Sequence, residues 1–323
     1  MLAFITQRIG KALVVLLAIV VLNFFLIRMA PGDPALVMAG EAGAGDQIFV
    51  AQLREKFGLD KPLPVQLYVY VKGILSLDLG FSFRQQMPVA KLILDRLPAT
   101  LLLTGTAFAI SLVFGVLFGT LAARWAGSWT DTTITVLALI FYATPLFWVA
   151  LMAILLFSVA MDWLPSFGYE TVGANYTGFA HVLDVGAHLI MPATTIGLFF
   201  MATYTRMTRA SMLEVKRHDF VKTARAKGLR DAVIQRRHVL RNALLPVVTL
   251  AGLQAGTLVG GAVLTETVFA WPGIGRLMYE ALLQRDYNLL LGVFVVCSAM
   301  VLVFNLLTDL IYRSVDPRIE FAA

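Results

Sequence analysis

The run Thr100–Ala123 reads TLLLTGTAFAISLVFGVLFGTLAA, which is 24 residues without a charged side chain. Lipid offers the backbone no hydrogen-bond partners, so a membrane-crossing segment is a helix of about 20 apolar residues or a strand of a closed barrel. Barrel strands alternate in hydrophobicity over about ten residues, whereas this run is apolar throughout. It therefore predicts a transmembrane helix.

The composition extends this prediction to the whole chain. Of its 323 residues, 59% are hydrophobic and 14% are charged, and the mean hydropathy is +0.80. A soluble domain carries about 25% charged residues, so a soluble globule and a disordered chain are excluded. The single cysteine, Cys297, has no partner for a disulfide framework. The sequence predicts an all-α integral membrane protein.

We predict six transmembrane helices. The first is expected to be a retained anchor rather than a cleaved signal peptide, because its apolar stretch is long. The third is long enough to tilt, or to kink at Pro145, and the fourth is short and contains Pro192. The six runs are Ile9–Ile27, Thr100–Ala123, Thr133–Ala160, Leu189–Thr205, Leu245–Val268 and Leu289–Tyr312.

Basic residues set the predicted orientation. The segment Arg206–Arg241 holds 11 of the 26 lysines and arginines but only three acidic residues, which gives it a net charge of +8. The segment Met161–His188 holds no lysine or arginine. Basic loops stay in the cytoplasm, so the first segment is predicted inside and the second outside. Both termini are then cytoplasmic, and the long loop Ala30–Pro98 is extracytoplasmic.

The chain lacks the motifs of several functional classes. It has no G-x-x-x-x-G-K-[ST] loop for ATP phosphates, no H-E-x-x-H or C-x-x-C motif and no G-x-S-x-G turn. We therefore predict no cofactor, no metal site and no catalysis on this chain, and we assign its positive charge to topology rather than to nucleic acid. A channel or a secondary transporter stays open, but it would favour an ionisable residue near the bilayer midplane. The charged candidates are Glu266, near the outer end of the fifth run, and Asp309, near the inner end of the sixth.

Regularly spaced glycines predict close helix packing. Gly252, Gly256 and Gly260 recur every fourth residue in the fifth run, and Gly115 and Gly119 do so in the second. Small residues let helix backbones approach each other where lipid provides no hydrophobic drive for association.

The cytoplasmic stretch Asp219–Pro246 reads DFVKTARAKGLRDAVIQRRHVLRNALLP. Asp219 is predicted to cap a short helix, and Gly228 to end it in the left-handed conformation. Between them Phe220, Thr223, Ala224 and Lys227 share one helical face, and we expect packing to hold so short a helix in place. A second amphipathic helix is predicted from the spacing of three residues, which are Val233, Arg237 and Leu240.

This stretch resembles the EAA signature of ABC-importer permease subunits, EAA-x3-G-x9-I-x-L-P. Gly228 matches its glycine, Ala224 its second alanine and Leu240 its leucine. The chain departs from the signature at four positions, where it has Lys222, Thr223, His238 and Arg241 in place of Glu, Ala, Ile and Pro.

The departures resemble one branch of that family, the dipeptide, oligopeptide and nickel permeases. That branch reads T-A-R-A-K-G-L followed by H-x-L-R-N-A-L-L-P, as in Thr223–Leu229 and His238–Pro246. Further matching strings occur in order along nearly the whole chain, namely APGDP at 30–34, FGLDKPLP at 57–64, DLGxS at 78–82, RLPAT at 96–100, MPATTIG at 191–197, ETVFAWPGIG at 266–275 and DPR at 316–318.

The resemblance implies an organisation and a set of partners. Residues 1–98 would hold the first transmembrane helix and an extracytoplasmic loop, and 99–323 a five-helix permease core with its coupling loop at 206–245. The coupling helix would dock on a separate ATPase subunit. The complex would contain two such subunits, and these would bind ATP and Mg. A second homologous permease and an extracytoplasmic solute-binding protein would complete a complex in the bacterial inner membrane.

The resemblance also implies roles for particular residues. The expected ATPase-coupling residues are Asp219, Phe220, Thr223, Ala224, Arg225, Lys227 and Gly228. The coupling loop would be supported by His238, Arg241, Asn242 and Pro246. The expected pathway or outer-gate residues are Glu266, Phe269, Trp271, Pro272 and Gly273.

The function implied is ATP-driven import of dipeptides or oligopeptides by alternating access. Two alternatives stay open, one within the family and one outside it. A permease for nickel or glutathione would share the same motifs, and an ATP-independent secondary transporter would work without the coupling helix.

Overall fold

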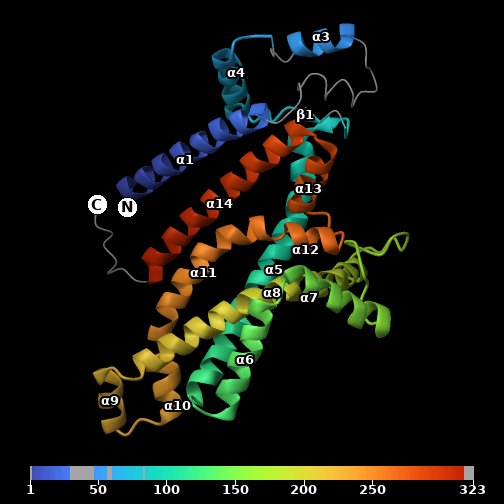
Figure 1. Ribbon diagram of the computed structural model, residues 1–323. Helices are drawn as coiled ribbons and strands as arrows, with labels where there is room; N and C mark the ends of the chain where they lie inside the picture. The colour runs from blue at the N-terminus through green and yellow to red at the C-terminus, as the bar shows by residue number, and fades with distance from the viewer. Residues whose placement is uncertain (1, 30–46, 57–59, 83, 316–323) are drawn as a thin grey trace. The chain divides into compact units, whose positions relative to one another are not determined.

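The computed structural model of the protein describes residues 2–29, 47–56, 60–82 and 84–315 (Figure 1). It is almost wholly helical, which agrees with the predicted all-α class. The α-helices are α1 (Leu2–Met29), α3 (Gln47–Lys56), α4 (Leu63–Leu75), α5 (Val89–Arg124), α6 (Trp129–Ala143), α7 (Leu146–Ala153), α8 (Phe179–Val215), α9 (Asp219–Ala226), α10 (Asp231–Val233), α11 (Arg241–Gly261), α12 (Val263–Val268), α13 (Ile274–Gln284) and α14 (Tyr287–Val315). Two π-helical turns, η1 (Ile154–Ala160) and η2 (Ile234–Leu240), and a two-stranded antiparallel hairpin, β1 (Phe81–Ser82) with β2 (Met87–Pro88), complete the described elements.

Four helices in the described part of the chain are long and apolar enough to cross a membrane. They are Thr6–Leu26 within α1, the whole of α5, the whole of α8 and Tyr287–Thr308 within α14. A fifth is reached if α6 and the α7–η1 pair count as one broken span. The predicted fifth run, Leu245–Val268, falls on α11 and α12, which are not among these helices. The count of six therefore stays a prediction.

The third predicted span is not one continuous helix. The chain bends by 102° between Trp129–Ala143 and Leu146–Ala160. Thr144 is extended, with φ −82° and ψ 134°, because a residue before proline is pushed out of the helical region. The sequence located the irregularity at Pro145 but predicted a tilt or a kink, and the structure has a sharp break there.

The fourth predicted span is much longer than expected. The run Leu189–Thr205 lies inside α8, which has 37 residues and extends ten residues beyond the run at each end. Pro192 lies within this helix and does not end it. The loop that is predicted to be extracytoplasmic therefore ends at Gly178, and the basic segment that begins at Arg206 starts as a continuation of α8.

The described residues form two compact units. The first comprises Met1–Thr100 and Pro272–Val303, and the second comprises Leu101–Trp271 and Phe304–Ala323. This division follows contacts, whereas the predicted division at residue 98 follows the family's organisation and stays a prediction.

In the first unit the DLGxS string leads into β1, and its last residue, Ser82, links the hairpin to the junction between α13 and α14. The Ser82 hydroxyl donates to the carboxylate of Asp286, and both side chains are buried. The same carboxylate accepts from the backbone N–H of Leu289, with 3.1 Å between the atoms. A hydrophobic core lies beside this link and joins the start of α5 to α13 and α14 through Val89, Ile93, Leu277, Leu289 and Val293, among others.

In the second unit α8 is the central helix. It packs against α6, α7, α11 and α12, and its approach to α5 is close. A Cβ atom added at Gly115 would lie 2.5 Å from the Cβ of Tyr204, and one at Gly119 would lie 2.6 Å from the backbone oxygen of Thr205. No side chain fits at these two positions, so they need glycine.

Candidate functional site

The helix α9 lies at the end of α8 that is remote from α7 (Figure 1). One side of α9 is anchored in a hydrophobic cluster. Val221 is fully buried and Ala224 is 6% exposed. They pack with residues from the end of α5, the end of α8, η2 and the start of α11, which are Ala123, Met212, Ile234, Val239 and Ala243. This cluster is called the α9 anchor below.

The other side of α9 faces solvent. Phe220 is 43% exposed, and Thr223, Arg225 and Lys227 are exposed as well. This differs from the predicted packing face, because only Ala224 of its four members is buried. Val221, which the sequence reasoning missed, takes the position that was expected for Phe220. The four exposed residues Phe220, Thr223, Arg225 and Lys227 are called the outer face of α9.

The two ends of α9 are stabilised differently from each other. His218, not Asp219, is the N-cap residue, and its side chain makes no capping hydrogen bond. Asp219 is the first helical residue, where a carboxylate favours the helix dipole, and its Oδ1 lies 2.8 Å from Nζ of Lys222. At the other end Gly228 has φ +75°, which matches the predicted left-handed end. Its N–H donates to the carbonyl of Arg225 over 2.9 Å.

Lys216 links the turn between α8 and α9 to the end of α5, and no pattern in the sequence indicates this contact. Its ammonium group donates to the backbone carbonyl of Ala123, one of the last carbonyls of α5, which lacks a partner within its own helix. Burial, together with the nearby charge of Arg225, lowers the pKa of Lys216. A cation at a helix C-terminus also favours the helix dipole.

A partly buried ion pair joins α6 to α8, and this pair was also missed. Arg209 donates from Nε to Oδ1 of Asp131 over 2.6 Å and from a terminal nitrogen to Oδ2 over 2.8 Å. The backbone N–H of Gly127 donates to the same carboxylate over 2.9 Å. Asp131 is 4% exposed. Bidentate pairs of this kind fix geometry as well as charge, so the start of α6 and the C-terminal part of α8 are held in register.

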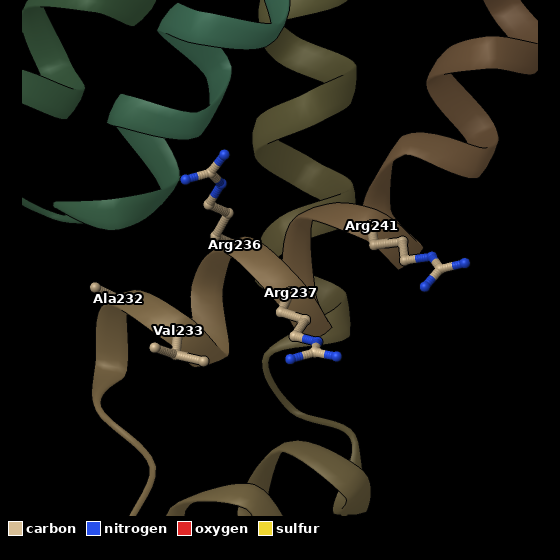
Figure 2. A pocket seen from close by; sticks show the side chains of 5 residues that line it. All are labelled: Ala232, Val233, Arg236, Arg237 and Arg241. Atoms are coloured by element: carbon tan, nitrogen blue, oxygen red, sulfur yellow. The ribbon is translucent and has the colours of Figure 1, made fainter.

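The four predicted support residues lie on η2 and α11 but do not gather in one place. His238 is partly buried, and its backbone carbonyl accepts from the side-chain amide of Asn242 over 2.6 Å. Arg241 is exposed and opens α11, while Pro246 lies inside α11. Arg241 also lines a hollow of about 540 Å3, which Figure 2 shows with its other lining residues, Ala232, Val233, Arg236 and Arg237.

The ETVFAWPGIG string is a buried turn. Glu266 and Trp271 are fully buried, and Phe269 is 2% exposed. The N–H of Trp271 donates to the carbonyl of Glu266 over 2.8 Å. The Trp271 ring also lies against Tyr169 from the predicted outer loop, with 4.9 Å between ring centroids.

The rest of the string continues into the next helix. Pro272 is partly exposed, and the buried Gly273 is the N-cap residue of α13. The predicted gate residues thus adjoin one another, and most have little contact with solvent.

Of the three packing glycines predicted in the fifth run, Gly252 lies at a close helix approach. A Cβ there would lie 1.8 Å from the Thr308 methyl carbon, and the Thr308 hydroxyl donates to the Gly252 carbonyl over 3.1 Å. The surroundings of Gly256 and Gly260, and of Asp309, lie outside the described residues. Among the described residues, no group of three or more His, Cys, Asp or Glu side chains is placed to hold a metal ion.

Comparison with known families covers almost the whole chain. Residues 115–321 match the family described as binding-protein-dependent transport system inner membrane component. Residues 1–104 match the N-terminal domain of the same membrane components.

Individual relatives and a solved structure agree with that match. The chain is 41% identical to the dipeptide transport system permease protein DppB of Escherichia coli K12, over 99% of each chain. It is 38% identical to the protein of the same name from Alkalihalophilus pseudofirmus, over 99% of this chain and all of that one. The fold resembles the MetNI methionine ABC transporter in an inward-facing conformation, with a TM-score of 0.56 and 21% identity over 70% of this chain and 96% of that one.

The described helices, the family match over residues 115–321 and the full-length relatives agree with the motif at 223–246. The chain therefore belongs to the family of binding-protein-dependent transport system inner membrane components, the permease subunits of ABC importers.

Proposed function

We propose that this chain forms one half of the translocation pathway of an ATP-driven importer for dipeptides and oligopeptides. The substrate class follows the relatives, which are dipeptide permeases at 41% and 38% identity over the full chain. The observation that carries the ATP-driven part is the two-sided helix α9. One side is fixed in the α9 anchor, and the other leaves polar and aromatic side chains in solvent.

The outer face of α9 would dock on a separate ATPase subunit. Phe220 offers an apolar contact, and Arg225 and Lys227 offer positive charge around it. The aromatic side chain is the natural centre of such a contact, because aromatic residues commonly supply most of the binding energy at protein interfaces. ATP and Mg would be bound by that subunit, since this chain carries no P-loop.

The α9 anchor would transmit the movement of the ATPases into the membrane. Val221 and Ala224 contact the ends of α5 and α8 together with η2, and Lys216 adds a hydrogen bond to α5. Movement of α9 therefore pulls on several long helices at once. ATP binding can shift the permease between inward- and outward-facing states only through contacts that differ between those states, and the docked outer face would supply them.

The remaining members of the complex follow from the family. A second homologous permease would complete the pathway, two ATPase subunits would bind the two coupling helices, and an extracytoplasmic binding protein would deliver the peptide. We place both termini and the segment 206–241 in the cytoplasm. The buried turn that contains Glu266, Phe269 and Trp271, with Pro272 and Gly273 after it, would lie at the outer end of the pathway and form part of a gate there.

The test is uptake by the complete complex in proteoliposomes. The chain is co-expressed with its partner permease, ATPases and binding protein, and accumulation of a labelled dipeptide is compared with that of Ni2+ and of glutathione. We expect dipeptide uptake that requires both ATP and the binding protein. Uptake of Ni2+ or glutathione in place of peptide would overturn the substrate class. Uptake by the chain alone, without ATP, would overturn the importer mechanism itself.

A further inference from the structure

A basic hollow of about 540 Å3 lies where η2 meets the start of α11. Figure 2 shows three arginine side chains leaving this short stretch of chain, two from η2 and one from the first residue of α11. We call the hollow lined by Ala232, Val233, Arg236, Arg237 and Arg241 the arginine hollow. It belongs entirely to the second compact unit, and the coupling mechanism above makes no use of it.

The arginines of the hollow have no carboxylate partner among the described residues. Other cations of the same cytoplasmic region do have one. Arg209 pairs with Asp131, Lys222 with Asp219, and Arg225 with Asp231 at 3.7 Å. Three like charges around one hollow raise the local positive potential, and an anion that enters it is attracted by all three.

The position of the hollow favours an anion at the membrane surface. Arg241 is the first residue of α11, and the predicted apolar run begins four residues later at Leu245. Leu245 follows Arg241 by about one turn of α11 and is 36% exposed. Val233, which lines the hollow, is 41% exposed. Positive charge therefore meets exposed apolar surface at the level where the chain enters the bilayer.

We propose that the arginine hollow binds the phosphate-bearing headgroup of an anionic phospholipid of the cytoplasmic leaflet. A guanidinium group pairs with two phosphate oxygens at once, and Arg237 and Arg241, four positions apart in sequence, both line the hollow. The acyl chains would continue along the exposed side of α11 past Leu245. Basic pockets on the cytoplasmic side of membrane helices bind lipid headgroups by the same chemistry. The proposal does not depend on the peptide substrate.

The test is phosphatidylglycerol binding to the full chain in detergent, measured by native mass spectrometry. The double variant Arg237→Gln/Arg241→Gln removes two guanidinium groups from the hollow. The control Arg217→Gln/Arg230→Gln removes the same charge from two exposed positions of the same segment outside the hollow. We expect the first variant to bind phosphatidylglycerol about 30-fold more weakly and the control to lose less than about threefold. The zwitterionic lipid phosphatidylcholine should bind both variants and the unmodified chain alike.

Three outcomes would overturn the proposal. Equal loss of phosphatidylglycerol in both double variants would reduce the effect to general charge. Full displacement of the lipid by millimolar inorganic phosphate would identify a site for the free ion rather than for a lipid. Unchanged lipid binding, with loss of ATPase assembly in the hollow variant alone, would assign the arginines to an acidic surface of the ATPase. Because the uptake assay above tests substrate and ATP dependence, its failure is distinguishable from failure here.

Discussion

Gly228 is the residue whose backbone most tightly constrains the coupling loop. Its φ is +75°, yet no atom lies within 4 Å of the point where a Cβ would be placed. The position therefore restricts conformation and not size. A side chain in the left-handed region costs about 1–2 kcal/mol, and Asn and Asp tolerate that region best. Conformation and docking chemistry can thus be separated at this one residue.

Three substitutions of Gly228 should have three different outcomes. Gly228→Asn should keep both thermal stability and substrate-stimulated ATP hydrolysis, because Asn adopts the required φ. Gly228→Val should lower the Tm of the purified chain, because a β-branched side chain resists that φ. Gly228→Asp should insert and fold normally but lose ATPase stimulation in the reconstituted complex, because it adds a carboxylate beside the docking face. Full stimulation in the Asp variant would count against the docking assignment.

Lys216 should make the stability of the chain depend on pH in a predictable direction. Its pKa is lowered in the folded protein, so the unfolded chain binds more protons between that lowered value and the usual pKa of about 10.4. Stability then rises with pH across this window. Relative to Lys216→Met, which does not titrate, the unmodified chain should gain Tm as the pH rises towards the usual lysine pKa of about 10.4. A constant difference in Tm between the two proteins would contradict the burial of the ammonium group.

At the scale of the element, α9 has one buried side, which packs in the α9 anchor, and one exposed side, for which we propose docking. Val221 and Phe220 are neighbours in sequence but differ in their surroundings, the first being fully buried and the second 43% exposed. Adjacent residues of an amphipathic helix can differ in burial in this way because they point about 100° from each other. The pair offers a matched comparison within a single helix.

Substitution of each neighbour by alanine should separate stability from assembly. Val221→Ala should cost about 2 kcal/mol of stability, because it empties part of the α9 anchor. Phe220→Ala should leave the Tm within about 1 °C of the unmodified chain but weaken co-purification of the ATPase. The measurements are thermal unfolding of the chain and the amount of ATPase retained on it in detergent. If Phe220→Ala destabilised the chain while ATPase binding persisted, the two sides would be assigned the wrong way round.

The sequence predicted the C-terminal end of α9 correctly, but not its N-cap residue or its packing. A glycine at position 228 after a short helical pattern is a local signal, and local signals fix backbone conformation. Which of Phe220 and Val221 faces inward depends on what the rest of the chain brings to α9. Val221 packs against the small side chain of Ala123, and Lys216 donates to the backbone carbonyl of the same residue. Because Ala123 lies at the end of α5, far away in sequence, no local pattern could identify Val221 or Lys216.

At the scale of the whole molecule, the length of the apolar runs predicted an all-α membrane protein. The limits of hydropathy explain why the bounds of two predicted spans differ from the helices of the structure. Hydropathy marks the apolar residues of a helix but not where the helix ends. It therefore missed the ten additional residues at each end of α8, which are more polar. It also treated Thr133–Ala160 as one segment, although Pro145 lies in a bend of 102°. Proline marks the place of a break, while packing determines its angle.

The predicted orientation can be tested by chemical labelling, because Cys297 is the only cysteine. In a Cys297→Ser background, Val172→Cys should react with a membrane-impermeant maleimide in cells whose outer membrane alone has been permeabilised. Val172 is 98% exposed and lies in the loop without lysine or arginine. Lys227→Cys should react only after the inner membrane is opened. The reverse pattern would invert the topology and place α9 on the wrong side for any ATPase.

The ion pair between Asp131 and Arg209 has a consequence for synthesis. The two residues are 78 positions apart, and a ribosome adds about 5–20 residues per second. The Asp131 carboxylate is therefore synthesised about 4–16 s before its guanidinium partner. During that interval α6 lacks the contact that fixes it against α8, and the nascent chain depends on the insertion machinery or on water at the membrane surface to solvate the charge. Assembly of these two helices is thereby timed by translation, and it cannot be completed until the end of α8 has been made.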